Sequence, residues 1–116
     1  MKDMKLVYTA FSKHNFYFRL FISKFVYKKG YIPINPFLIS DYFLLDTIPR
    51  DTVREANNTL VKRCDELWVF GQISNGVLAE INIAKKLKKP IHYFDISNSP
   101  KITPLSEKNV EMEDGI

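Results

Sequence analysis

Cysteine and glycine are scarce in this chain, and each scarcity excludes a class of protein. The 116 residues include one cysteine, Cys64, which excludes an intrachain disulfide framework and a metal site built from several cysteines. Four glycines and six prolines are too few for a low-complexity chain. A single thiol is compatible with a reducing compartment, so we expect a cytoplasmic protein.

Long apolar runs and several catalytic motifs are also missing. The most apolar stretch, residues 16–27, is interrupted by Arg19 and Lys24, and no stretch reaches the roughly 20 apolar residues of a membrane span. We therefore expect no membrane segment and, without a small-residue cleavage site, no signal peptide. There is no Walker motif, dinucleotide-binding glycine pattern, histidine-rich metal pattern or serine nucleophile elbow, and we predict neither a metal nor a cofactor.

The net charge of +4 is unevenly distributed. Residues 1–106 carry a formal charge of +7, whereas residues 107–116 carry −3. A basic body suits an anionic ligand. The basic residues form no run with interleaved aromatic residues, so we do not expect nucleic-acid binding.

Strand-like and helix-like segments alternate along the chain. The predicted strands cover residues 6–10, 31–34, 67–70 and 91–95, and the predicted helices cover residues 16–29, about 52–64 and 74–89. The pair Thr52 and Glu55 fits a capping box at the start of the second helix. Its inward face would hold Val53, Ala56, Leu60, Val61 and Cys64.

This alternation predicts a parallel sheet with right-handed crossovers. We predict a three-layer α/β/α sandwich with a four- or five-stranded parallel sheet of the Rossmann or flavodoxin-like type. The domain would cover residues 1–96, and residues 97–116 would form a partly ordered acidic tail. Ligands of such sheets bind at the carboxyl ends of the strands, where residues 9–15, 35–50 and 71–76 would converge.

Residues 36–50 are apolar and aromatic without a clean period. A loop this apolar either folds over a pocket or packs on a partner chain. A short irregular helix is an equally good interpretation.

The stretch Ser74–Glu80 opens the third helix directly after an apolar strand. Ser74 and Gly76 could hold an anion, because the first amide groups of a helix have no partner within it. The alternative is an ordinary N-cap and turn. Glu80 lies too deep for a capping box, and it is either a reactive carboxylate or an exposed helix glutamate.

Asn57 falls on the predicted inward face of the second helix, between Val53 and Leu60. A polar amide on an apolar face needs hydrogen-bond partners or a water-filled pocket.

These residues resemble the nucleoside 2-deoxyribosyltransferase superfamily, including its small deoxynucleoside 5′-monophosphate N-glycosidases. The resemblance covers about residues 5–95. It rests on Tyr8 near the end of the first strand, on Cys64-Asp65 before an apolar strand, and above all on the spacing of Ser74, Gly76, Val77 and Glu80.

The resemblance implies a role for each matching position. Glu80 would be the catalytic carboxylate that attacks C1′ of the sugar, with Tyr8 near it. Ser74 and Gly76 would bind the 5′-phosphate, and Ser12 and Lys13 would lie near the phosphate or base. It also implies a homodimer or larger assembly, in which Ser97, Asn98 or Ser99 of a neighbouring subunit completes the site.

Two positions depart from the family pattern. Asn57 stands where the family usually has an Asp, and Ala10 stands where it usually has a glycine. An amide cannot ionise, so loss of the Asp could cost about 10²–10⁴ in rate.

We therefore predict an enzyme that cleaves or transfers at the N-glycosidic bond of a (deoxy)nucleoside or its 5′-monophosphate. Glu80 would act as the nucleophile or the key carboxylate, Tyr8 and Asn57 would orient it and the sugar, and residues 37–43 would cover the base. The main alternative is a module of the same fold that binds a nucleotide without turning it over. A nucleic-acid or protein interaction domain that uses the basic surface is a third, less favoured interpretation.

Overall fold

The structure is a computed structural model that describes residues 3–40 and 42–113. Five strands form one sheet in the order β2-β1-β3-β4-β5. The first four strands are parallel, as predicted, but β5 pairs antiparallel with β4. The strands are β1 (Leu6–Ala10), β2 (Ile32–Ile34), β3 (Glu66–Phe70), β4 (Ile91–Asp95) and β5 (Thr103–Leu105).

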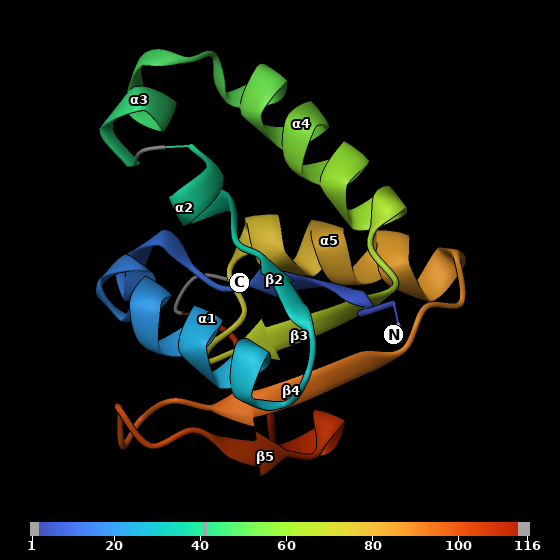
Figure 1. Cartoon of the computed structure of the whole chain (residues 1–116). Helices are drawn as coiled ribbons and strands as arrows, with labels where there is room; N and C mark the ends of the chain where they lie inside the picture. The colour runs from blue at the N-terminus through green and yellow to red at the C-terminus, as the bar shows by residue number, and fades with distance from the viewer. Residues whose placement is uncertain (1–2, 41, 114–116) are drawn as a thin grey trace.

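Helices cover both faces of the sheet, which confirms the predicted α/β fold (Figure 1). On one face, α4 and α5 pack against the core residues Tyr8, Leu67 and Val69. On the other face, α1 packs against Val7, Trp68, Phe70 and Phe94. The helices are α1 (Arg19–Lys28), α2 (Pro36–Ile39), α3 (Tyr42–Thr47), α4 (Arg50–Arg63) and α5 (Asn75–Lys86), with short 3-10 helices at Lys13–Phe18 and Glu107–Asn109.

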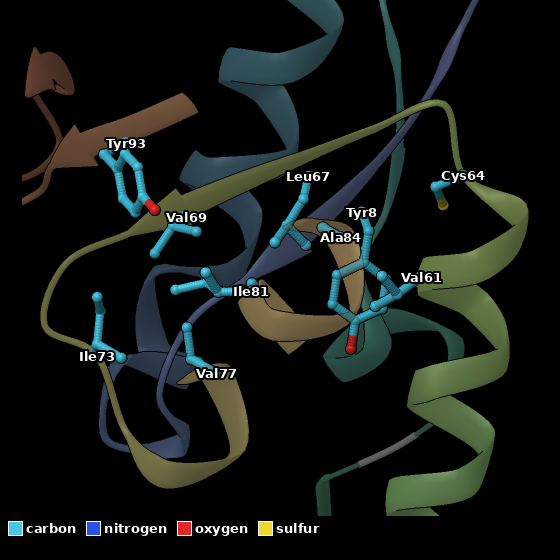
Figure 2. Close-up of a cluster of buried hydrophobic side chains, with 11 residues drawn as sticks. Tyr8, Val61, Cys64, Leu67, Val69, Ile73, Val77, Ile81, Ala84 and Tyr93 are labelled. Atoms are coloured by element: carbon cyan, nitrogen blue, oxygen red, sulfur yellow. The ribbon is translucent and has the colours of Figure 1, made fainter. Parts of the chain in front are cut away.

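The strand β3 is the centre of the molecule because it is buried along its whole length. All five of its residues are buried, as expected for a parallel strand with helices on both faces. Figure 2 shows Leu67 and Val69 of β3 directed toward Ile81 and Ala84 of α5. This packing fixes the start of α5 relative to the end of β3.

The helix α4 differs from its prediction in two ways. It begins at Arg50 after Pro49, so the capping box predicted at Thr52 is wrong, and Thr52 lies within the helix. Ala56 was expected on the inward face, but it is exposed. Val61 is the buried residue of this helix, so the C-terminal end of α4 holds it against the body.

The segment between β2 and α4 folds into two short helices, α2 and α3, rather than an open loop. The helix α2 is fixed by Asn35, whose side chain accepts a hydrogen bond from the Phe37 amide at 3.0 Å. Pro36 stands at the first helical position, where its missing donor costs nothing.

The C-terminal segment contributes to the sheet. Thr103 pairs with Asp95, and Leu105 pairs with Tyr93. Further along, the Ile73 amide donates to the Glu111 carbonyl at 2.9 Å, and the Glu113 amide donates to the Ile73 carbonyl at 3.0 Å. Residues beyond the predicted boundary at 96 therefore pair with two parts of the body.

None of the helices in residues 3–40 and 42–113 is long and apolar enough to cross a membrane.

Candidate active site

A cavity of about 670 Å³ lies where residues 8–14 of β1 and the following loop meet the helices α2 to α5. Its volume falls within the range of small-molecule sites, and its place at the carboxyl ends of parallel strands is the one predicted. It is lined by the seven residues that the sequence singled out as catalytic or phosphate-binding within one subunit: Tyr8, Ser12, Lys13, Asn57, Ser74, Gly76 and Glu80.

Glu80 and Tyr8 form a buried pair at this cavity. Glu80 lies in the second turn of α5, and its carboxylate accepts a hydrogen bond from the Tyr8 hydroxyl at 2.5 Å. Tyr8 is fully buried and Glu80 is 8% exposed, so Glu80 is not an exposed helix glutamate. Figure 2 shows the Tyr8 ring beside Val61 of α4, with its hydroxyl group directed away from Leu67.

Burial changes the ionisation of both side chains. It raises the pKa of Glu80 to about 7, against the smaller opposing effect of the Tyr8 hydrogen bond. Burial and the neighbouring Glu80 carboxylate raise the pKa of Tyr8 well above its usual value. Near neutral pH, Tyr8 therefore remains a hydrogen-bond donor while Glu80 populates both its charged and its neutral form.

Ser74 and Gly76 form the start of α5, directly after the end of β3. The Ser74 hydroxyl accepts a hydrogen bond from the Val77 amide at 3.2 Å, so Ser74 is the N-cap of this helix. Its hydroxyl proton is still available for a ligand. A Cβ atom added at Gly76 would meet nothing closer than the Ser74 oxygen at 4.0 Å, so the backbone at Gly76 is open to a ligand.

Ser12 and Lys13 approach the cavity from the loop after β1. Ser12 is 1% exposed, and its hydroxyl oxygen accepts a hydrogen bond from the His14 amide at 3.2 Å. This bond fixes the turn that leads into the first 3-10 helix. Lys13 is exposed and lines the cavity beside His14.

Asn57 reaches the cavity from α4, as the helical periodicity predicts. It is half-buried, and it shares one helix stripe with Arg50, Val53 and Arg54, all of which line the cavity. The sequence analysis did not single out the two arginines. The signal was present, because Arg54 lies one turn before Asn57 on the same face.

The sequence analysis also missed Glu113, which lines the same cavity. The bridge between Ile73 and Met112 brings this C-terminal residue beside the start of α5. No local pattern could have revealed it, because the contact joins segments that are far apart in the chain. Phe37 of α2 lines the cavity too, whereas the side chains of Tyr42 and Phe43 lie outside the described part of the structure.

The chain matches a protein-family model over residues 7–94, which contain most of the cavity wall described above. The description of that model is "Domain of unknown function (DUF7768)". The chain belongs to the DUF7768 family. No curated protein matches the chain.

Among solved structures, this DUF7768 chain is similar to a chain described as "2-desoxiribosyltransferase from Leishmania mexicana". The TM-score is 0.60 and the sequence identity 17%, with 80% of this chain and 65% of the other chain covered. At that identity the similarity shows a shared fold.

Three other residues of interest in the DUF7768 chain lie apart from the cavity. The Asp65 carboxylate accepts a hydrogen bond from the Leu6 amide at 2.8 Å, which fixes the turn before β3. Burial raises the pKa of Cys64 to about 11, so it remains a thiol. Ser97, within the segment expected to complete a neighbouring site, hydrogen-bonds to the Asp95 carboxylate.

A metal site is not evident in the described residues of this DUF7768 chain, where no three His, Cys, Asp or Glu side chains lie close enough to share an ion.

Proposed function

We propose that this DUF7768 protein cleaves or transfers at the N-glycosidic bond of a (deoxy)nucleoside or its 5′-monophosphate. The observation that carries the proposal is the buried pair of Glu80 and Tyr8 at the cavity. A carboxylate with a pKa near neutrality and one fixed donor is suited to nucleophilic attack at neutral pH. The fold shared with a protein described as a deoxyribosyltransferase supports the same conclusion.

In this mechanism Glu80 attacks C1′ of the sugar in its charged form. The bond between C1′ and the base nitrogen breaks, and its electron pair leaves with the base. Water then attacks C1′ and releases the free sugar, or a second base attacks and completes a transfer. The Tyr8 hydroxyl holds the carboxylate through its hydrogen bond and so sets the direction of attack.

The remaining site residues would bind the rest of the ligand. We assign the 5′ end of the sugar, with or without a phosphate, to Ser12, Lys13, Ser74 and Gly76, and the orientation of the sugar to Asn57. A 5′-monophosphate would make the activity that of the N-glycosidase branch. We also propose a homo-oligomer, which light scattering of the purified protein would measure.

The test is incubation of the purified protein with a panel of nucleosides and 5′-monophosphates, followed by chromatography for free base. Glu80→Gln keeps the shape of the side chain and removes the nucleophile. The matched control is Glu55→Gln, on the exposed surface of α4. We expect base release by the wild type and the control but not by Glu80→Gln. Equal release by all three proteins would overturn the proposal.

A second candidate function is nucleotide binding without turnover. Asn57 favours it, because an amide cannot protonate a leaving base. Calorimetry that detects nucleotide binding by a protein with no base release would support this function.

A further inference from the structure

The large apolar side chains of the cavity wall gather on one side. The helices α2 to α4 and the turn between α3 and α4 contribute Phe37, Leu45, Ile48 and Val53, together with the polar or charged Asp46, Arg50, Arg54 and Asn57. The strand β1 with its following loop and the start of α5 contribute short polar groups, Thr9, Ser12, Ser74, Asn75 and Gly76, beside the apolar Phe11 and Val77. A planar base suits the apolar side, and the hydroxyl or phosphate end of a sugar suits the polar side.

The pair of Glu80 and Tyr8 belongs to neither set, since it joins α5 to β1. A sugar that extends from the polar side with C1′ at Glu80 would hold its base against α4. The groups on α4 that face this base would be Asn57 and the residues that share its stripe.

A departing base needs help, because it takes the electron pair of the broken bond. Asn57 can donate a hydrogen bond but cannot supply a proton to it. Arg54 lies on the same face one turn earlier and lines the same cavity. Its guanidinium group is a permanent cation with several donors in a fixed plane.

In the part of the chain that the structure describes, neither burial nor an ion pair holds Arg54 in place. It is exposed, and the buried residue of α4 is Val61, two turns away. Among residues 3–40 and 42–113, no carboxylate lies within ion-pair distance of its guanidinium group. Its charge is therefore available to a ligand.

We propose that Arg54 stabilises the departing base, a task for which the Asn57 amide has no ionisable proton. This inference rests on the proposed function. When the C1′–N bond breaks, Glu80 forms a bond to C1′ and the base leaves as an anion beside the guanidinium group. Water then attacks C1′ and the bond between Glu80 and C1′ breaks, with its electron pair returning to the carboxylate. The base takes one proton of that water, and the remaining hydroxyl group stays on C1′.

The test compares Arg54→Gln with the wild type and with Arg63→Gln. Arg63 is an exposed arginine near the C-terminal end of the same helix, outside the cavity wall, and serves as the matched control. We expect Arg54→Gln to lower kcat for base release by about 10²-fold with a much smaller change in KM, as for loss of one group that stabilises transition-state charge. Arg63→Gln should leave kcat unchanged, and Arg54→Lys should recover part of the loss.

If Arg54 had only a structural role, Arg54→Gln would not change how the rate depends on the acidity of the leaving base. A series of substrates whose bases differ in acidity measures that response. We expect Arg54→Gln to depend more steeply on base acidity than the wild type, because the anion is no longer stabilised.

Two failures can be separated. Absence of base release by the wild type overturns the proposed function itself. Release by the wild type together with an unchanged kcat and an unchanged leaving-group response in Arg54→Gln overturns only the role of Arg54. Arg54 is exposed, so we expect an unchanged melting temperature, and unfolding of Arg54→Gln would overturn the inference that the residue has no structural role.

Discussion

At Glu80, protein stability and the proposed chemistry favour different protonation states of the carboxyl group. The proposed attack on a sugar carbon would need the charged carboxylate, while burial at 8% exposure favours the neutral acid. The Tyr8 hydroxyl reduces this conflict, since it donates to the carboxylate from a fully buried position. A carboxylate that is costly to bury is typical of a functional site.

Replacement of Glu80 by Gln should therefore stabilise the protein at alkaline pH. Burial raises the pKa of Glu80 from 4.5 to about 7, so between these values the native state binds more protons than the unfolded state and stability falls as pH rises. The total loss is on the order of 3 kcal/mol above pH 7. Urea unfolding at pH 8 should show Glu80→Gln more stable than the wild type by much of this amount, with a smaller difference at pH 5. The exposed Glu55→Gln serves as the control, and a loss of stability in Glu80→Gln at pH 8 would contradict the prediction.

The rate should rise with pH through the ionisation of Glu80 and then stay level. A plot of kcat/KM against pH is expected to climb around pH 7, because the proposed mechanism uses the charged form of Glu80. Asn57 does not ionise and Arg54 keeps its charge, so neither produces a falling limb between pH 8 and 9. The other charged or titratable groups of the cavity wall are Tyr8, Lys13, His14, Asp46, Arg50 and Glu113.

The variant Asn57→Asp introduces an ionisable group at a position where the wild type has none. It therefore tests whether the lack of an acid there explains the level pH profile. A protonated carboxyl group at this position could donate to the base, so the variant should acquire a falling limb on the alkaline side and a bell-shaped profile. A wild-type profile that is already bell-shaped below pH 9 would show that another group acts as the acid.

Among the elements, α5 follows most directly from its sequence. Its N-cap Ser74 and its position after an apolar strand are local signals, and the structure places both as predicted. Loss of the Ser74 hydroxyl should lower the free energy of unfolding by about 1 kcal/mol, because the Val77 amide loses its partner. Thermal or urea unfolding of Ser74→Ala measures this.

Ser106→Ala is the matched control for this cap. Ser106 stands at the start of a short 3-10 helix but makes no side-chain cap bond to a backbone amide. Its hydroxyl oxygen accepts only an exposed hydrogen bond from the Asn109 side-chain amide at 2.9 Å, so its loss should cost only a few tenths of a kcal/mol. Equal losses in the two variants would show that the Ser74 cap contributes nothing specific.

The elements that sequence reasoning missed depend on distant contacts. The start of α4 was predicted two residues late. A good capping-box pattern begins at Thr52, but the helix begins directly after Pro49, whose ring restricts the backbone at that point. The strand β5 contains Pro104 and has only three residues, so it shows no alternating pattern of its own. Its pairing with β4 is what makes it a strand. Helical periodicity from Asn57 could have predicted Arg54 at the cavity. No such local pattern could have predicted Glu113 there.

At the scale of the whole molecule, the sheet was largely predictable because its strands alternate with helices along the chain. The alternation could not predict the last strand, β5, which pairs antiparallel with β4. The division into a domain of residues 1–96 and a tail of 97–116 stays a prediction. Three residues of the predicted tail contact the core: Ile102 packs against one core cluster, and Leu105 and Val110 pack against the other.

Removal of residues 97–116 tests that division. We expect the shortened chain to fold with lower stability, because β4 loses its antiparallel partner and the two core clusters lose three partly buried apolar side chains. Circular dichroism during thermal unfolding would give the change in melting temperature. A chain of residues 1–96 with no cooperative transition would place the segment 97–116 within the folding unit.

The helix α4 is held in the core near its C-terminal end, and this affects how easily its N-terminal turns open. Val61, near its C-terminus, is buried in the core, whereas residues 50–52 and 54–56 are exposed. The N-terminal turns should therefore open locally at a lower free energy than the C-terminal turn, and their amides should exchange hydrogen for deuterium faster. Those turns carry Arg54, so a nucleotide that binds there would slow their exchange. Part of the binding energy would then be spent on ordering the helix, and affinity would be lower than the contact surface suggests.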